Sequence, residues 1–584
     1  MYFIFFSHFS ENLTFYVYNI FFEAYNSKCI FERGKYSMNW KKPFAVAMTG
    51  AMLAGCGSST GTSTSSTGGT ESTGGTITVA MDADLNTMDY EVATDGNSFI
   101  MQTMCEAGLL RLDENEQPVP DLAESYDVSE DGKTYTFHLR DGAKWSNGTP
   151  VTANDFVYGW RRLVDPELAS EYNFIMDTIG VVNAADVIAG TKPLEDLGVE
   201  ATDDSTFVVH LNQPCGFLLG LMAFPSFFPL NQEFYESKGS DYAVGSVDDL
   251  IYCGPYTMTE WSAGNQYTFT KNEDYWDADS ISGSDVTFKF LQDTQSAMME
   301  YQQGNIDVVK LTSEQVDAYK DTEGFTTRLT GYGWRLDFCF DDASIQNKDL
   351  REAISKGIDR QSIADDVLKD GSVPATGYIP KEFAYGPEGD DFRETSGEIL
   401  KTTADAEGAK AAYEKAKAAL GGDVTLELLT EDSESCKAVA ENIQQQLQTN
   451  LPGITITINS VPKKTRLESM QNNDYQIGLT RWGPDYADPQ TFLDIYKSDR
   501  AGYTASYSNE EYNALMNKAE TGEDAADFEK RWADLVEAEQ ILLDDYAMAP
   551  VYQNGGAMMI SPKVTGVQFH NGGVDSYRYV AKEA

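Results

Sequence analysis

Short stretches of alternating apolar and polar residues dominate the chain from about residue 76 to 335. Alternation with a period of two is typical of half-buried β-strands. It predicts strands over residues 76–81, 134–139, 206–211, 267–270 and 286–291. Amphipathic spacing over residues 153–163 predicts a connecting helix. The pattern indicates an α+β lobe made of small sheets.

From about residue 345 the apolar positions recur at helical spacing. This spacing predicts helices over residues 348–368, 403–420, 433–447, 508–519 and 523–546, and Ser508 with Glu511 fits a capping box for the fourth. Strand-like runs at 424–429 and 454–458 flank the third helix, which predicts a parallel βαβ unit. Strand-like sequence returns at 564–569 and 576–581. We therefore expect the second lobe to be inserted into the first, with a hinge near 334–340 and 549–553.

The run from Pro43 to Gly55 is apolar but too short to span a bilayer. Lys41 and Lys42 precede it, and Leu53-Ala54-Gly55-Cys56 follows the pattern of a bacterial lipoprotein cleavage site. Residues 38–55 are thus predicted to be a signal peptide, with Cys56 the lipidated first residue of the mature chain. A Gly/Ser/Thr-rich tether completes residues 56–75. We expect synthesis to start at Met38, with residues 1–37 a mis-called start; a membrane anchor there is the competing interpretation.

The composition argues against several classes of function. About 500 residues after the tether are too many for one core, so two or more lobes are expected. The formal net charge of −49 argues against nucleic acid as a partner. The histidines are few and scattered, and no catalytic triad or metal motif is present, so we expect no enzyme activity, no metal and no cofactor. Five cysteines follow the tether, and because five is odd at least one must be free or pair with another chain: Cys105, Cys215, Cys253, Cys339 and Cys436.

Several strings then point to a family. DGKTYTFHLR at 131–140 is followed by KW at 144–145 and TANDF at 152–156, and GPY at 254–256, NEDYW at 272–276, LREAI at 350–354 and IDR at 358–360 come later in the same order. Together they resemble family 5 extracellular solute-binding proteins, the peptide/nickel group of ABC importers. The likeness covers residues 76–584 and is greatest to oligopeptide-binding lipoproteins. Most of the large residues in these strings, such as Trp145 and Trp160, are expected to be scaffold.

The resemblance implies a two-lobed α/β clamp of the periplasmic-binding-protein type (type II, similar to cluster C). Lobe I would comprise residues 76–336 with an additional subdomain at roughly 105–235, lobe II residues 337–550, and residues 551–584 would return to lobe I. The implied function is to bind short peptides and deliver them to ABC permease subunits. The protein would be a monomer, lipid-anchored on the extracellular face of the cytoplasmic membrane of a bacterium without an outer membrane.

The resemblance also implies a binding site. In the sequence WGPDYADP at 482–489, Asp485 would pair with the ligand's α-ammonium group, and Trp482 and Gly483 would present backbone to the ligand. From local sequence alone Asp485 would be a turn residue. Asp488 fits a helix N-cap followed by proline, which makes it structural. Tyr172 and Phe174 are candidates for the pocket wall, although core packing explains them equally well.

Several residues are candidates for binding the carboxylate at the other end of the peptide. Where relatives use basic residues for the peptide carboxylate, this chain has Leu479 and Cys436, so Arg481, Lys437 or Arg335 would have to substitute. Two alternatives stay open: the same fold with a nickel chelate, haem, an opine or a cationic metabolite as ligand, and a peptide-signal sensor or adhesin without transport.

Overall fold

The computed structural model describes residues 75–387, 389–484, 486–498 and 507–583. Within these ranges no helix has the length and apolar character needed to cross a membrane. The secondary structure is a mixture of strands and helices throughout, as the sequence pattern predicts.

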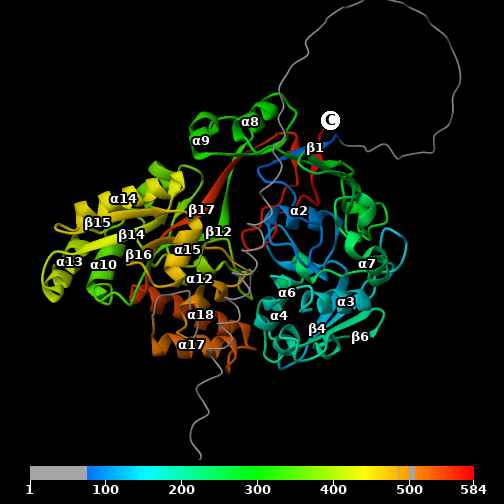
Figure 1. Cartoon of the computed structure of the whole chain (residues 1–584), viewed down its shortest axis with the longest axis horizontal. Coiled ribbons are helices and arrows are strands. Elements are labelled where there is room, and N and C mark those ends of the chain that lie inside the picture. Colours follow the sequence, from blue (N-terminus) through cyan, green and yellow to red (C-terminus); the bar gives the residue numbers. More distant parts are fainter. Residues whose placement is uncertain (1–74, 388, 485, 499–506, 584) are drawn as a thin grey trace, which may run out of the picture. The chain divides into compact units, whose positions relative to one another are not determined.

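The largest sheet is built around two long antiparallel strands, β12 (Phe325–Phe338) and β17 (Met548–Ile560), which run side by side in Figure 1. On the β12 side the order continues through β16 (Ile477–Trp482), β14 (Thr425–Glu431) and β15 (Thr455–Val461). On the β17 side it continues through β11 (Val308–Leu311), β1 (Ile77–Met81), β10 (Val286–Phe290), β9 (Gln266–Lys271) and β8 (Tyr256–Ser262). The short strand β13 (Val373–Pro374) also pairs with β17.

Two groups of strands therefore share this central pair. β12 pairs with β16 over residues 333–338, whereas β17 pairs with β11 over residues 557–560. Between these regions the β12–β17 ladder is interrupted, because the register shifts between Leu329 and Gly333. The interruption lies where the chain passes from one group of strands to the other.

A smaller antiparallel sheet has the order β4 (Ala123–Val128), β5 (Thr134–Leu139), β7 (Thr206–His210) and β6 (Val199–Asp203). Two further pairs are β2 (Leu110–Leu112) with β3 (Pro118–Pro120) and β18 (Val564–Thr565) with β19 (Ala581–Lys582). The helices before β12 are α2 (Gly96–Cys105), α3 (Ala153–Leu163), α4 (Phe174–Thr178), α5 (Ala184–Ile188), α6 (Leu218–Leu221), α7 (Gln232–Lys238), α8 (Thr294–Gln302) and α9 (Ser313–Tyr319).

After β12 the helices are α10 (Lys348–Lys356), α11 (Arg360–Ser362), α12 (Phe392–Ser396), α13 (Ala406–Leu420), α14 (Glu434–Asn450), α15 (Lys463–Gln471), α16 (Gln490–Leu493), α17 (Glu510–Glu520) and α18 (Phe528–Asp544). One hydrophobic core gathers side chains from residues 77–308. Val564, Tyr577 and Val580, near the end of the chain, are buried in that same core. Two other cores take their side chains from residues 334–552. The sequence-based domain boundaries themselves stay a prediction.

Several predicted elements differ in detail. Residues 348–368 do not form one helix, because α10 ends at Lys356 and Asp359 caps a new start, accepting a hydrogen bond from the Ser362 amide at 2.9 Å. The last long helix begins at Phe528 instead of 523. α17 is capped by Asn509, whose side chain accepts from two backbone amides, and not by Ser508. The strands expected at 564–569 and 576–581 are only two residues each.

Candidate functional site

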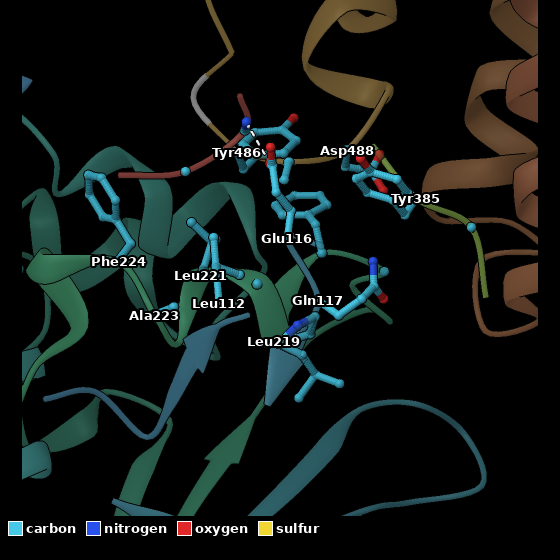
Figure 2. A pocket seen from close by; sticks show the side chains of 18 of the residues that line it. Leu112, Glu116, Gln117, Leu219, Leu221, Ala223, Phe224, Tyr385, Tyr486 and Asp488 are labelled. Carbon is cyan, nitrogen blue, oxygen red and sulfur yellow. Dashed lines mark hydrogen bonds between the residues drawn. The ribbon is translucent and has the colours of Figure 1, made fainter. Parts of the chain in front are cut away.

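A pocket with a cavity volume of about 210 Å³, open to solvent, is lined by segments that lie far apart in the sequence (Figure 2). Leu112, Leu221 and Phe224 come from the first part of the chain, and Tyr385 and Tyr486 from the part after β12. Its other lining residues include Phe217, Leu219, Phe528, Trp532 and Val574. Most of these side chains are apolar or aromatic, which is the usual composition of a small-ligand site.

The segment from Trp482 to Asp488, which contains the predicted ligand contacts, leads from the end of β16 into this pocket. Tyr486 stacks on Phe217, with ring centroids 3.8 Å apart and ring planes 7° from parallel. The Cα of Ala487 lies so close to Gly572 that a Cβ on this glycine would come within 3.1 Å of it. This segment thus contacts residues of the first core and the last part of the chain.

Gly483 lies directly beneath an aromatic ring. A Cβ at this position would come within 2.1 Å of a ring carbon of Tyr332, the residue at the interruption in β12. Real Cβ atoms do not approach other atoms so closely, so any larger residue must displace the ring. Glycine is therefore required for the close approach between this backbone and Tyr332.

Replacing Gly483 with alanine is expected to displace Tyr332 and to weaken ligand binding. The Tyr332 side chain is 42% exposed and can move aside, so the loss of stability should be only about 1 kcal/mol. The matched control is Gly96→Ala, where an added Cβ meets no atom within 4 Å. Ligand affinity and thermal unfolding of both variants provide the comparison; equal affinities for the two variants would contradict the expectation.

Asp488 and Arg531 form a buried ion pair beside the pocket. The two carboxylate oxygens accept hydrogen bonds from the two terminal guanidinium nitrogens, each at 2.8 Å, and both side chains are 6% exposed. Asp488 also accepts from the Gln490 amide at 2.9 Å, although the helix cap itself is Pro489. Asp488 is therefore structural, as the sequence indicates, but mainly because Arg531 holds it.

Glu116 is a second acidic residue at the pocket, and its carboxylate is also already hydrogen-bonded within the protein. Its carboxylate accepts hydrogen bonds from the backbone amides of Asn571 and Gly572. Burial raises the pKa of this carboxyl to about 6, against the opposing effect of the two amides. A folded-state pKa above the ordinary value means that Glu116 favours the folded state below about pH 4.5 and that this contribution is lost as the pH rises through about 6.

The sequence-predicted wall residues Tyr172 and Phe174 join the pocket through neighbouring rings. Tyr172 packs on Phe224 at 5.4 Å and on Phe99 at 5.8 Å, and Phe174 stacks on Tyr172 at 6.1 Å. Phe224 lines the pocket directly. Tyr172 is half-buried, while Phe174 is 45% exposed. The rings form one aromatic surface that ends in solvent at Phe174.

The remaining predicted residues cluster at the end of β16. Arg481 lies opposite Trp334 of β12, and Trp482 is half-buried with its indole nitrogen 3.4 Å from the Thr491 hydroxyl. Cys436 is 1% exposed in the first turn of α14, where its thiol contacts a Glu431 carboxylate oxygen at 3.6 Å. Two predicted positions, the ligand-binding Asp485 and the lipidated Cys56, lie outside the described residues.

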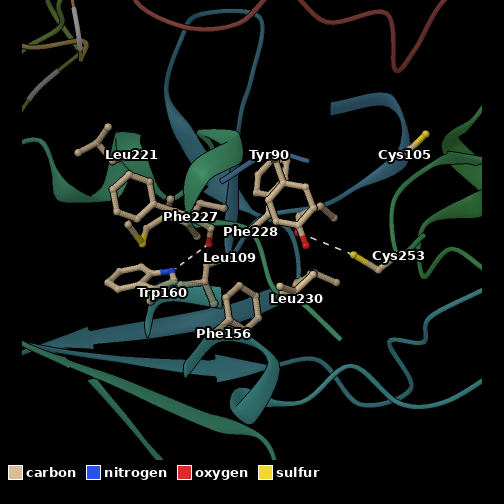
Figure 3. Close-up of a cluster of buried hydrophobic side chains, with 14 of the residues drawn as sticks. Tyr90, Cys105, Leu109, Phe156, Trp160, Leu221, Phe227, Phe228, Leu230 and Cys253 are labelled. Carbon is tan, nitrogen blue, oxygen red and sulfur yellow. Dashed lines mark hydrogen bonds between the residues drawn. The ribbon is translucent and has the colours of Figure 1, made fainter. Parts of the chain in front are cut away.

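The motif residues expected to be scaffold are in cores. Trp160 is fully buried against the rings of Phe227 and Phe207, and its indole nitrogen donates to the Phe227 carbonyl at 3.0 Å (Figure 3). Cys105 and Cys253, which Figure 3 also labels, are free thiols. All five cysteines that the described ranges contain are buried and unpaired, which agrees with the prediction of at least one free thiol.

Sequence reasoning missed the residues that line the pocket, among them Glu116, Phe217, Tyr486 and Arg531. Tyr486 lies in the sequence WGPDYADP at 482–489, which contains the predicted ligand contacts, so its position in that motif could have identified it as a pocket residue. Phe217 and Arg531 carried no such signal, because nothing local distinguishes them from a core aromatic residue and a surface cation. Their roles depend on contacts with residues far away in the sequence.

Residues 117–504 match the bacterial extracellular solute-binding proteins, family 5 (Middle), and the chain belongs to this family. Its class is therefore that of extracytoplasmic binding proteins, which bind a solute and are not enzymes. The chain is 30% identical over 545 residues to a dipeptide-binding protein of Lactococcus lactis subsp. cremoris (strain MG1363), covering 91% of this chain and 96% of that protein.

Two solved structures agree in fold. Listeria monocytogenes OppA bound to peptide has a TM-score of 0.67 and 34% identity, covering 88% of this chain and 100% of that one. The unliganded open form of MppA, a periplasmic murein tripeptide-binding protein, has a TM-score of 0.77 and 27% identity, covering 87% and 98%. The expected two-lobed α/β clamp with an additional subdomain is confirmed.

Proposed function

We propose that this chain is the peptide-binding component of an ABC importer: it captures short peptides between its two lobes outside the cell and delivers them to a membrane permease. The observation that carries the proposal is the pocket where Tyr486 meets Phe217. The chain enters this pocket through the motif that implied peptide binding. Family membership and the names of the relatives, a dipeptide-binding protein and a peptide-bound OppA, support the same ligand class.

In this proposal Asp485 binds the peptide's α-ammonium group, and Trp482 and Gly483 offer backbone hydrogen bonds that any peptide sequence can use. Among the described residues, the acidic side chains that line the pocket are Glu116 and Asp488, and they already hold backbone amides and Arg531. A ligand cation would therefore need another acidic partner, and the family resemblance offers Asp485. Tyr172 and Phe174 would supply an aromatic surface for ligand side chains.

Closure over the peptide is proposed to use the interruption in the β12–β17 ladder. Residues 334–338, where the sequence suggested a hinge, are paired with both β16 and β17, so bending there would break regular hydrogen bonds. Residues 330–332 leave that register, and side-chain contacts such as that of the Thr330 hydroxyl, which donates to the Asn554 carbonyl at 3.0 Å, join the two strands there. Cys56 would keep the clamp tethered to the membrane beside its permease.

Peptides with a free amino terminus are expected to bind at least about tenfold more tightly than N-acetylated ones, since acetylation removes the charge-assisted hydrogen bonds that an ammonium group donates to a carboxylate. Asp485→Asn should remove most of this difference. The control is Asp474→Asn, an exposed acid just before β16. Titration calorimetry on protein stripped of ligand gives the affinities. Equal binding of both peptide forms by the unaltered protein would refute the ammonium contact, and binding of neither would refute peptide capture.

A further inference from the structure

A second pocket, with a cavity volume of about 330 Å³, lies beside the β12–β17 pair. Residues of both strands, the segment 373–381 and α12 line it, and none of them lines the pocket around Tyr486. Its volume is at the lower end of the range of about 300–1,000 Å³ that is usual for small-molecule sites. The pocket is therefore separate from the candidate peptide site and large enough for a small ligand.

Arg335 lines this pocket from β12 and has a donor group to spare. The residue is 3% exposed, and its Nε and Nη2 donate to the two carboxylate oxygens of Asp337, each at 2.8 Å. Its Nη1 has no hydrogen-bond partner among the described residues. Burial opposes the charge of this guanidinium group, but Asp337 raises its pKa above the ordinary value, so the side chain stays a cation.

Arg393 lines the same pocket from α12 and has two unpaired nitrogen atoms. Its Nη2 donates to the Glu539 carboxylate and to the Ser396 hydroxyl. Its Nε and Nη1 have no partner within the described ranges, and the residue is 7% exposed. Gly377 makes room for this guanidinium group, which fills the space that a Cβ on the glycine would occupy. The position of the cation is thus built into the segment that lines the pocket.

The charges around the pocket favour an anionic ligand. Among the described residues, the charged side chains that line it are Arg335, Lys381, Arg393 and Glu398. Glu398 is exposed, whereas the carboxylates that pair with the two arginines do not line the pocket. Buried N–H groups are costly to leave without an acceptor, and an oxyanion can accept hydrogen bonds from several charged donors at once.

We propose that this second pocket binds a small oxyanion, the carboxylate or phosphate group of a small metabolite, against the unpaired N–H groups of Arg335 and Arg393. Lys381, whose side chain is 43% exposed, adds a third positive charge to the site. Trp482, Gly483 and Tyr486 do not line this pocket, so the site does not depend on the proposed peptide binding.

The test is calorimetric titration of the ligand-free full chain with inorganic phosphate, with succinate, and with glycerol as a neutral compound. The unaltered protein should bind one anion per chain and no glycerol, and the tighter of the two anions shows whether phosphate or carboxylate is preferred. The formal net charge of −49 repels anions in general, so saturable binding requires a local site. Binding should also raise the melting temperature.

Two variants locate the site. Arg393→Lys keeps a cation for Glu539 but removes the unpaired guanidinium donors, so anion affinity should fall about tenfold or more. Lys381→Gln changes a partly exposed side chain and should weaken binding about threefold. The matched control is Lys401→Gln, a 74% exposed lysine that does not line the pocket and whose loss should leave the affinity unchanged.

No saturable anion binding by the unaltered protein, or the same affinity in Arg393→Lys as in Lys401→Gln, would overturn the assignment. Thermal unfolding without anion shows which variants are folded, and Lys381→Gln decides the question if Arg393→Lys does not fold. Glycerol binding as tight as that of the anions would overturn the choice of an oxyanion. Peptide affinity should be the same in all variants, so that a failure of this site and a failure of the proposed function are seen separately.

Discussion

Replacing Asp121 with alanine is expected to lower the free energy of unfolding by about 3–5 kcal/mol, because the change would leave a buried cation without its partner. Asp121 is fully buried and accepts hydrogen bonds from Arg578, Tyr275 and Trp276 at 2.7–2.8 Å. Burial works against the Arg578 cation, yet Asp121 and Tyr275 raise its pKa above the ordinary value. Alanine would leave three donors and one charge unsatisfied.

Loss of Asp121 should also loosen the last segment of the chain. Arg578 belongs to the final segment and its carbonyl accepts from the Tyr256 hydroxyl at 3.2 Å, so Asp121 anchors this segment to the first core. Urea unfolding should show the loss of stability, and limited proteolysis should cleave near residues 564–582 earlier than in the unaltered protein. The control is Asp127→Ala, whose side chain is 81% exposed and paired with His138, so that about 1 kcal/mol or less is lost. Similar losses for the two variants would contradict the expectation.

Local sequence patterns predicted helices and strands well where the apolar spacing and the capping residues agree. Helix α3 has the predicted limits because Thr152 and Asp155 form a capping box directly before a strongly amphipathic run. The parallel pair β14–β15 could likewise be predicted, from two strand-like runs on either side of a helix. In these cases the information lies within a few residues, and tertiary contacts reinforce it.

The prediction was wrong where a tertiary contact overrides the local apolar spacing. The apolar period from 348 to 368 is continuous enough to resemble one helix, yet the chain breaks after Lys356 and Asp359 caps a new turn. Arg360 explains the break, because its buried guanidinium donates to the Pro550 carbonyl at 2.7 Å and so turns this segment toward β17. A contact to a strand near the end of the chain is not visible in a local pattern.

The sequence motif pointed to a segment of the chain and not to that segment's partners. The resemblance singled out Trp482 and Gly483, and the structure places Tyr486, a few residues further along, in the wall of a pocket. The ligand-binding role of these residues stays a prediction. The sequence left Arg481, Lys437 and Arg335 as candidates for the carboxylate. The structure pairs Arg335 with Asp337, and that pairing depends on burial that a single sequence does not reveal.

Replacing Arg531 with methionine is expected to cost about 3–5 kcal/mol of folding free energy and to weaken ligand binding as well. Arg531 neutralises Asp488, and its guanidinium lies against Gly216, where an added Cβ would come within 2.8 Å of it. Gly216 precedes Phe217, which stacks on Tyr486. The cation therefore supports both sides of the pocket, and its loss should disturb the ligand surface as well as the core.

A double-mutant cycle separates these two effects. Adding Asp488→Asn to Arg531→Met removes the uncompensated buried charge, so the double variant should be more stable than the single variant by about 1 kcal/mol or more. Peptide affinity should remain low in both, because neither restores the contact with Gly216. Lys530→Met is the matched control: its exposed pair with Asp527 should contribute less than about 1 kcal/mol. Urea unfolding and calorimetry measure the two quantities. Full peptide affinity in Arg531→Met would show that the pair stabilises the core without shaping the pocket.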